Sequence, residues 1–402
     1  MAKNVFNHTD IYKYTANLTY ILDNKVYDIE TTSIRTIAID YDYDKMNMPM
    51  IFMTLGIYKS LANIMILNQN TGHFILDIKR CISNSDMPGL YRDYISDKFI
   101  YFITGDIDVD DTVEISEDAP DDDTTVTLGL LSLDHVNKNK KVVNGIINGK
   151  LSSAMYYLTS HLPIVIEPPT NNIMLENTIL PPVNSVAKSL EFLNSINVFY
   201  NTPYRFFIDF NHAYLISSSG KAVKSKGENI GSVMITINHD DTAEAKIQGM
   251  ITNKNQSLYE IYANSKDCEV SDIGLSEKSY RNISATTTSG SFNKATLSTV
   301  SKDSGVISKT KTIRVSNDNS GLLDNITASI DQSAIQVLIQ KIDIDSSIFT
   351  INKEYIIRAD GAYNRDTYNG KYLLTRKREL YMRDNETFTM DTMLLFKKVP
   401  DR

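Results

Sequence analysis

The chain has 402 residues, more than a single hydrophobic core usually supports, so two to four domains are expected. A formal charge of −8 at pH 7 argues against a general nucleic-acid-binding protein, although an acidic lining would suit a conduit through which DNA slides. Two distant cysteines, Cys81 and Cys268, argue against a disulfide framework, and no apolar run approaches the ~18 residues of a membrane span.

Residues 1–105 are predicted to form a first β domain, in keeping with a composition that includes 23 tyrosines. Asp23-Asn24 separates two strand-like runs, which is a two-residue hairpin signal. Ile34 to Tyr43 alternates apolar and polar residues, as a half-buried strand does. Further strands are expected over Ile51 to Ile57, Asn63 to Leu67, Phe74 to Arg80 and Phe99 to Thr104. About seven strands suit a barrel or a closed sandwich.

Residues 106–125 are predicted to be an acidic linker, because ten of the eighteen residues from Asp106 to Asp123 are Asp or Glu. Asp106, Asp108, Asp110 and Glu117 superficially match the ligand spacing of a calcium loop over 106–117. Asp111 stands where that loop needs its turn glycine, and no amphipathic helices flank the segment. A solvated linker is therefore the favoured interpretation, and calcium binding stays open.

Residues 126–225 are predicted to form an α+β lobe. Apolar residues at helical spacing indicate one short helix from Leu151 to Leu162 and a second from Val186 to Asn197, with Asn184 or Ser185 as its N-cap. A hairpin that turns at Asn211-His212 should follow, and its strand from Tyr204 to Phe210 is either a binding platform or, more commonly, core.

A second β domain is predicted over residues 226–261 and 311–402, split by a Ser/Thr-rich inserted subdomain over 262–310. It closes with a hairpin that turns near Asn385. The last strand should bury an apolar face made of Phe388, Met390, Leu394 and Phe396.

No catalytic constellation stands out in the sequence. There is no phosphate-binding glycine loop and no nucleophile elbow, so neither an enzyme nor a cofactor is predicted. No two histidines have the spacing of a metal-ligand pair. The six histidines are His8, His73, His135, His161, His212 and His239. Arg376, Lys377 and Arg378 form a basic cluster on the first strand of the closing hairpin, with Lys377 on the face opposite the two arginines. The cluster either contacts an adjoining subunit or keeps a sheet edge soluble.

The order of these parts resembles the baseplate hub proteins of contractile-tailed bacteriophages. The stretches that carry this resemblance are Val165 to Pro169, Ile179 to Pro182, Leu190 to Asn194, Tyr204 to Phe210, Ser347 to Thr350, Tyr368 to Leu374 and Phe396 to Lys398. The resemblance implies two tube-type antiparallel β-barrel domains per chain. It also implies a homotrimeric ring that adapts the six-fold tail tube to the three-fold central spike.

The partners implied by the resemblance are further copies of the chain, the central spike, tail tube or tube-initiator proteins, wedge proteins and tape-measure protein. DNA would pass through without specific binding. The N-terminus lacks the apolar core of a signal peptide, so production in the cytoplasm is expected. The resemblance implies residence in the virion after assembly in the host. The alternatives are another baseplate or tail component, such as a wedge or tube-capping protein, and a tail-associated cell-wall hydrolase.

Overall fold

The computed structural model describes residues 11–84, 87–104, 123–224, 231–238, 246–251, 257–264, 268–272, 279–287, 292–301, 307–316, 335–342, 346–359 and 369–399. This described part is mainly β, as predicted, and it contains few helices. The helices are η1 (Thr31–Ser33), α1 (Lys59–Leu67), α2 (Leu133–Asn139), α3 (Leu151–Thr159), α4 (Val186–Ile196) and η3 (Ser346–Ile348). None of the described helices has the length and hydropathy needed to cross a membrane.

The strands of the first half are β1 (Ile11–Leu22), β2 (Lys25–Ile29), β3 (Ile34–Asp42), β4 (Met50–Tyr58), β5 (His73–Asn84), β6 (Met87–Ile103), β7 (Asp123–Ser132), β8 (Lys140–Lys150), β9 (Ile164–Ile166), β10 (Met174–Ser185), β11 (Tyr204–Ile208) and β12 (Ala213–Ser217). Those of the second half are β13 (Gly231–Asn238), β14 (Lys246–Ile251), β15 (Ser257–Asn264), β16 (Cys268–Asp272), β17 (Ser279–Thr287), β18 (Phe292–Ser301), β19 (Ile307–Ser316), β20 (Ile335–Ile342), β21 (Glu354–Ala359), β22 (Gly370–Asp384) and β23 (Thr387–Lys398).

One large sheet organises the molecule, and part of it curls into a partial ring. The ring runs in the order β22-β3-β4-β7-β6-β5-β1-β23, and β23 pairs back to β22. Every neighbouring pair in it is antiparallel, and β1 meets β23 at the single register pair Tyr14↔Phe388. β7 therefore belongs to the same sheet as the strands of residues 11–104.

The strands of the partial ring bury one face at period two, because successive side chains of a strand point to opposite sides of the sheet. On β23 the predicted face of Phe388, Met390, Leu394 and Phe396 is buried. The three predicted hairpin turns are confirmed, at Asp23-Asn24, at Asn211-His212 between β11 and β12, and near Asn385. Asp23, Asn24 and Asn385 take the positive φ values that such turns need, at 46°, 66° and 57°.

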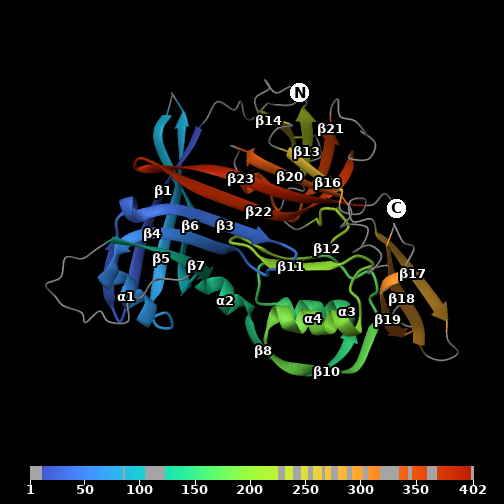
Figure 1. The fold of residues 1–402 in the computed structure, drawn as a ribbon. Coiled ribbons are helices and arrows are strands. Elements are labelled where there is room, and N and C mark those ends of the chain that lie inside the picture. The colour runs from blue at the N-terminus through green and yellow to red at the C-terminus, as the bar shows by residue number, and fades with distance from the viewer. Residues whose placement is uncertain are drawn as a thin grey trace.

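The closing hairpin of β22 and β23 links this ring to the strands of the second half. In β22, residues 370–372 pair with β21, and residues 376–382, beyond a bulge, pair with β3. In β23, Phe388 faces β1, and residues 392–397 pair with β20. Figure 1 shows the hairpin running across the molecule between the two sets of strands. Two groups of strands thus share one pair of long strands.

The second group of strands corrects one expectation, since it is mixed and not wholly antiparallel. β13 pairs parallel with both β15 and β21, while β14 is antiparallel to β15. β14 does not lie between β13 and β15 but on the far side of β15. β15 is antiparallel to β14 and lies next to β13, so β13 and β15 run in the same direction.

The α+β lobe has its own hydrophobic core. α3 and α4 lie between the twisted ribbon of β8 and β10 and the small sheet ordered β11-β12-β9 (Figure 1). The second helix begins as predicted, because the Ser185 hydroxyl accepts a hydrogen bond from the Lys188 N–H. Phe206 and Phe207 are buried at 4% and 0% exposure, which confirms that this aromatic strand is core.

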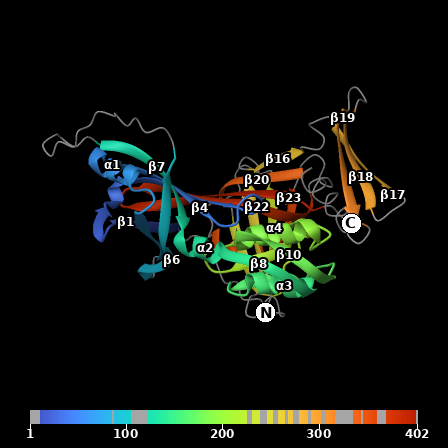
Figure 2. The ribbon, with the colours of Figure 1, turned by 90° about the horizontal axis from the view of Figure 1, so that it is seen from below.

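One local prediction is wrong, and another concerns residues that the structure does not describe. Asn63 to Leu67 is not a strand but the end of α1, in which Ala62 and Met65 bury one helical face at a spacing of three. The acidic segment 106–117, with its calcium-like spacing, lies outside the described residues. β17 and β18 of the predicted insertion form a separate sheet with β19, which runs past residue 310 to Ser316, and this sheet is seen at one side of Figures 1 and 2. The domain boundaries as a whole stay a prediction.

Candidate functional site: a polar core in the partial ring and an exposed lobe surface

The basic cluster of the closing hairpin divides between the inside and the outside of the sheet. Arg376 is partly exposed and donates from Nε to Asp40 Oδ1 at 2.8 Å, and its Nη2 contacts the other carboxylate oxygen. Arg378 is also partly exposed, whereas Lys377 is 4% exposed and points inward. The predicted alternation is therefore present, and a role of the cluster at a subunit interface stays a prediction.

Inside the ring, Lys377 belongs to a buried polar network centred on Glu379, a residue with 0% exposure. Lys377 Nζ lies 3.1 Å from Glu379 Oε1. The same carboxylate accepts hydrogen bonds from the hydroxyls of Tyr94 and Tyr381, each at 2.9 Å, and from Ser346. Because β6, η3 and β22 all contribute, the network ties three distant segments together.

The phenols in this network remain protonated donors. Burial raises the pKa of Tyr94 and Tyr381 well above 10, and the negative charge of Glu379 raises both further. Burial and the charge of Glu379 also raise the pKa of Tyr41. Lys377 Nζ lies 4.0 Å from the centre of the Tyr41 ring. Every hydroxyl contact of Glu379 is thus an O–H donor to a carboxylate, which is a strong hydrogen bond. The arrangement satisfies a buried charge and rigidifies the ring.

A second group of ion pairs and hydrogen bonds connects the lobe to the large sheet. Arg205 of β11 is 4% exposed and donates from Nε and Nη2 to Asp44 Oδ1 at 3.2 and 2.8 Å. Its Nη2 also donates to the Leu374 carbonyl at 2.7 Å, and Lys397 Nζ donates to Asp44 Oδ2 at 2.6 Å. Burial alone would raise the pKa of Asp44, but the charges of Arg205 and Lys397 outweigh it and lower that pKa.

We expect Arg205→Ala to lower the free energy of unfolding by about 2 kcal/mol, since hydrogen bonds to a charged group are lost and the Leu374 carbonyl is left without its donor. Urea unfolding measures this change. Hydrogen exchange of β11 and β12 should rise in the same variant. Lys188→Ala on the exposed face of α4 is the control, and equal stabilities of the two variants would contradict the assigned role.

His135 lies at the start of α2, between the ring and the lobe. The residue is 1% exposed, and its ring packs against that of Phe210 with the ring centres 5.0 Å apart and the planes tilted by 48°. Burial lowers the pKa of His135 to about 4, although the nearby Asp97 and the hydrogen bond to the Asp209 backbone act in the opposite direction. In the part of the chain that the structure covers, no three His, Cys, Asp or Glu residues come together as metal ligands.

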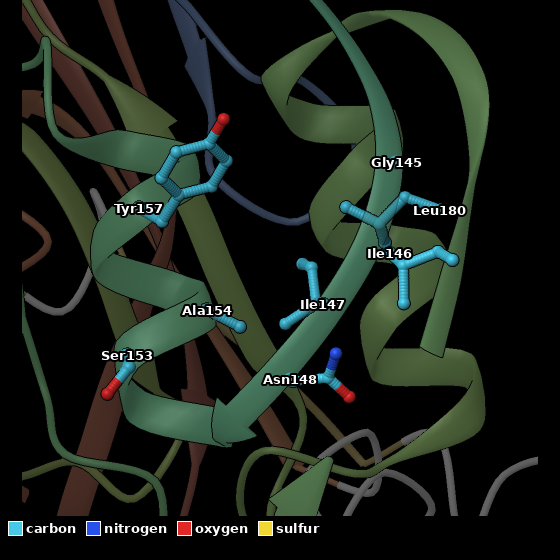
Figure 3. A pocket seen from close by; sticks show the side chains of 8 residues that line it. All are labelled: Gly145, Ile146, Ile147, Asn148, Ser153, Ala154, Tyr157 and Leu180. Carbon is cyan, nitrogen blue, oxygen red and sulfur yellow. The ribbon is translucent and has the colours of Figure 1, made fainter. Parts of the chain in front are cut away.

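The lobe also presents an apolar surface that sequence reasoning missed. Ile146 and Ile179 are directly opposite each other in β8 and β10, yet they are 62% and 68% exposed. A groove of about 340 Å³ lies beside them, with Tyr157, 61% exposed, on its far wall. Figure 3 shows Ile147 of β8 and Ala154 of α3 facing each other across this groove. We call Ile146, Tyr157, Ile179 and the adjoining groove the apolar lobe surface.

One signal of this surface was present in the sequence. β8 reads Val-Val-Asn-Gly-Ile-Ile-Asn-Gly-Lys from Val142 to Lys150, in which glycine recurs within a strand that packs against a helix. Glycine inside a strand often marks the close approach of another backbone.

Comparison with known proteins identifies the family. The family described as "Bacteriophage PBS1 gene 109 protein" matches residues 8–399. The chain belongs to this bacteriophage protein family. The predicted relationship to phage proteins is thereby confirmed, and no curated relative matches the sequence.

Several solved structures also align with this member of the gene 109 family. The tail protein from Neisseria meningitidis MC58 is 9% identical, with 96% of this chain and 97% of that chain covered and a TM-score of 0.47. The prophage MuSo2 43 kDa tail protein from Shewanella oneidensis is 10% identical, with coverage of 96% and 97% and a TM-score of 0.38. A chain of the Francisella PdpA-VgrG complex is 10% identical, with coverage of 98% and 60% and a TM-score of 0.40.

Proposed function

We propose that this gene 109 family protein is a non-enzymatic structural component of the phage tail, a homotrimeric baseplate hub that joins the six-fold tail tube to the three-fold central spike. The observation that carries the proposal is the shared hairpin of β22 and β23, which runs through both groups of strands. Shared strands hold two β units in a fixed relation. Such a unit suits a ring in which three chains present six β domains.

The ends of the large sheet support assembly through strand edges. β14 and β16 are the terminal strands of its described order. A terminal strand carries backbone groups that can pair with another chain. In the proposed ring, the lobe and the β17-β18-β19 sheet face neighbouring baseplate parts. The proposed partners are the central spike, the tube or its initiator, wedge proteins and tape-measure protein, with DNA passing through unbound.

Native mass tests the proposal. Light scattering should give three times the 45.4 kDa chain mass, either alone or after mixing with the phage's spike protein. A stable monomer under both conditions would contradict the hub and favour a wedge component. Six copies in a tail particle would favour a tube-capping protein instead.

The predicted interface role of the basic cluster has its own test. We expect Arg376→Glu/Arg378→Glu to shift the chain from trimer to monomer, because like charges would replace attractive contacts with acidic groups on a neighbour. Arg378→Glu alone separates this effect from the loss of the pair that Arg376 makes with Asp40. Arg383→Glu, on the exposed end of β22, is the matched control. An unchanged mass for both variants with intact folds would refute the interface role.

A further inference from the structure

The apolar lobe surface has the form of a binding site for an extended chain. Exposed cross-strand pairs are normally polar, so adjacent exposed Ile146 and Ile179 leave apolar area in water. The groove next to them is lined by uncharged residues of β8, β10 and α3 (Figure 3). A partner that buries this surface must therefore bring apolar side chains of its own.

The backbone of β8 is open to approach at both ends of this surface. Gly145 and Gly149 have φ values of +141° and +128°, which other residues rarely adopt, and a Cβ on either would meet nothing within 4 Å. Open space over two glycines lets a second backbone lie close to the strand.

The charges on the ribbon indicate an acidic partner. β8 carries exposed Lys140 and Lys150 near its two ends and has no acidic residue, and Lys188 is exposed on the neighbouring α4. The acidic residue of β10 is Glu176, which is also exposed. Apolar side chains between two lysines favour a segment that is both apolar and acidic.

The chain itself contains a segment of that chemistry. In residues 106–115, Ile107, Val109, Val113 and Ile115 fall on one face of an extended strand, and Asp111 is the single charged residue of that face. The opposite face would carry Asp106, Asp108, Asp110 and Glu114. Ten extended residues span roughly 33 Å, which matches the distance along a strand of the length of β8.

This segment cannot reach the lobe surface of its own chain. It begins after Thr104, whose N–H bonds to the Thr127 carbonyl, and ends at Asp123, the first residue of β7. Its eighteen residues, anchored at both ends, reach roughly 30 Å. The path to β8 covers the ten residues of β7, roughly 33 Å, and then α2. Figures 1 and 2 both place the start of β7 beside α1 at the left of the view, and the helices and ribbon of the lobe toward the centre, beyond α2.

We propose that residues 106–118 of one copy of this chain bind the apolar lobe surface of a neighbouring copy. The segment lies along β8, places its apolar face on Ile146, Ile179 and the groove, and directs acidic residues toward Lys140 and Lys150. Because the segment and the lobe surface are two different surfaces of the chain, the contact is head-to-tail, which closes a ring when the rotation permits. The inference extends the proposed assembly by naming one contact between its subunits.

A labelled peptide of residues 104–120 tests this contact. The receptor is the full chain carrying Ile107→Ser, Val109→Ser, Val113→Ser and Ile115→Ser, so that its own segments do not compete. Fluorescence anisotropy should rise to saturation. Ile146→Ser/Ile179→Ser in the receptor should weaken binding at least about tenfold, since two apolar side chains lose their contacts. Lys140→Glu/Lys150→Glu should weaken it roughly threefold or more at low salt, and less at high salt.

Two controls complete the test. Val26→Ser removes a side chain of 61% exposure on β2, far from the lobe, and should leave binding unchanged. A peptide of the same composition with its alternation permuted should not bind. Absence of saturation up to about 1 mM, or binding that Ile146→Ser/Ile179→Ser does not change, would overturn the inference. A wild-type trimer without peptide binding would refute this contact alone, whereas peptide binding by a chain that never forms trimers would refute the hub alone.

Discussion

Replacement of Lys377 by methionine should lower the free energy of unfolding by about 3–5 kcal/mol. Methionine keeps the apolar stem against Tyr41 but removes the ammonium that lies 3.1 Å from Glu379 Oε1. The carboxylate of Glu379 would then remain buried at 0% exposure with three hydroxyl donors and no counter-charge. Removing one member of a buried pair is costly for this reason.

Urea unfolding followed by circular dichroism measures the change. Lys371→Met makes the same chemical change at an exposed position of β22 and should alter stability by less than about 0.5 kcal/mol. In Lys377→Met/Glu379→Leu the unpaired charge is gone, so part of the lost stability should return. If Lys377→Met and Lys371→Met are equally stable, the ion pair does not stabilise the ring.

Acidification from pH 7 to pH 4 should cost the wild-type protein about 3 kcal/mol through His135 alone. The folded-state pKa of His135 is lowered by burial to about 4, while an unfolded histidine has a pKa of about 6.5. Between these two values the unfolded chain binds more protons than the folded chain. Stability therefore rises with pH across this window, and it falls as the pH drops toward 4.

The difference between wild type and His135→Gln isolates this contribution, because other titrating groups are common to both proteins. Wild-type stability relative to the variant should fall by about 3 kcal/mol between pH 7 and pH 4. A constant difference between wild type and His135→Gln would show that the imidazole titrates equally in the folded and unfolded chains.

Local structure could be predicted where the residues themselves decide it. Asp23-Asn24 and Asn385 tolerate positive φ, so the hairpin turns follow from residue type. The alternation of β23 specifies its buried face. The strand predicted over Asn63 to Leu67 fails because five apolar-rich residues do not separate a strand from the last turns of a helix.

Long-range pairing could not be predicted in the same way. β22 joins β3 through register pairs such as Arg376↔Asp42, between residues that lie far apart in the sequence. No local pattern encodes that choice. For the candidate site, the sequence correctly predicts that Lys377 faces away from Arg376 and Arg378. That Lys377 points inward could have been suspected, because Glu379 and Tyr381 share its face and provide a partner and an aromatic neighbour.

The shared hairpin has a consequence for synthesis on the ribosome. Residues 376–396 complete the partial ring, but they emerge roughly 240 residues after β7 ends at Ser132. At 5–20 residues per second, these residues follow β7 by roughly 10–50 s, and β1 and β3 remain without their β22 and β23 partners for at least that long. During that interval both carry unpaired edges that attract other nascent chains. We expect newly made protein to depend on chaperones until translation is nearly complete, and slower translation of the second half to increase aggregation.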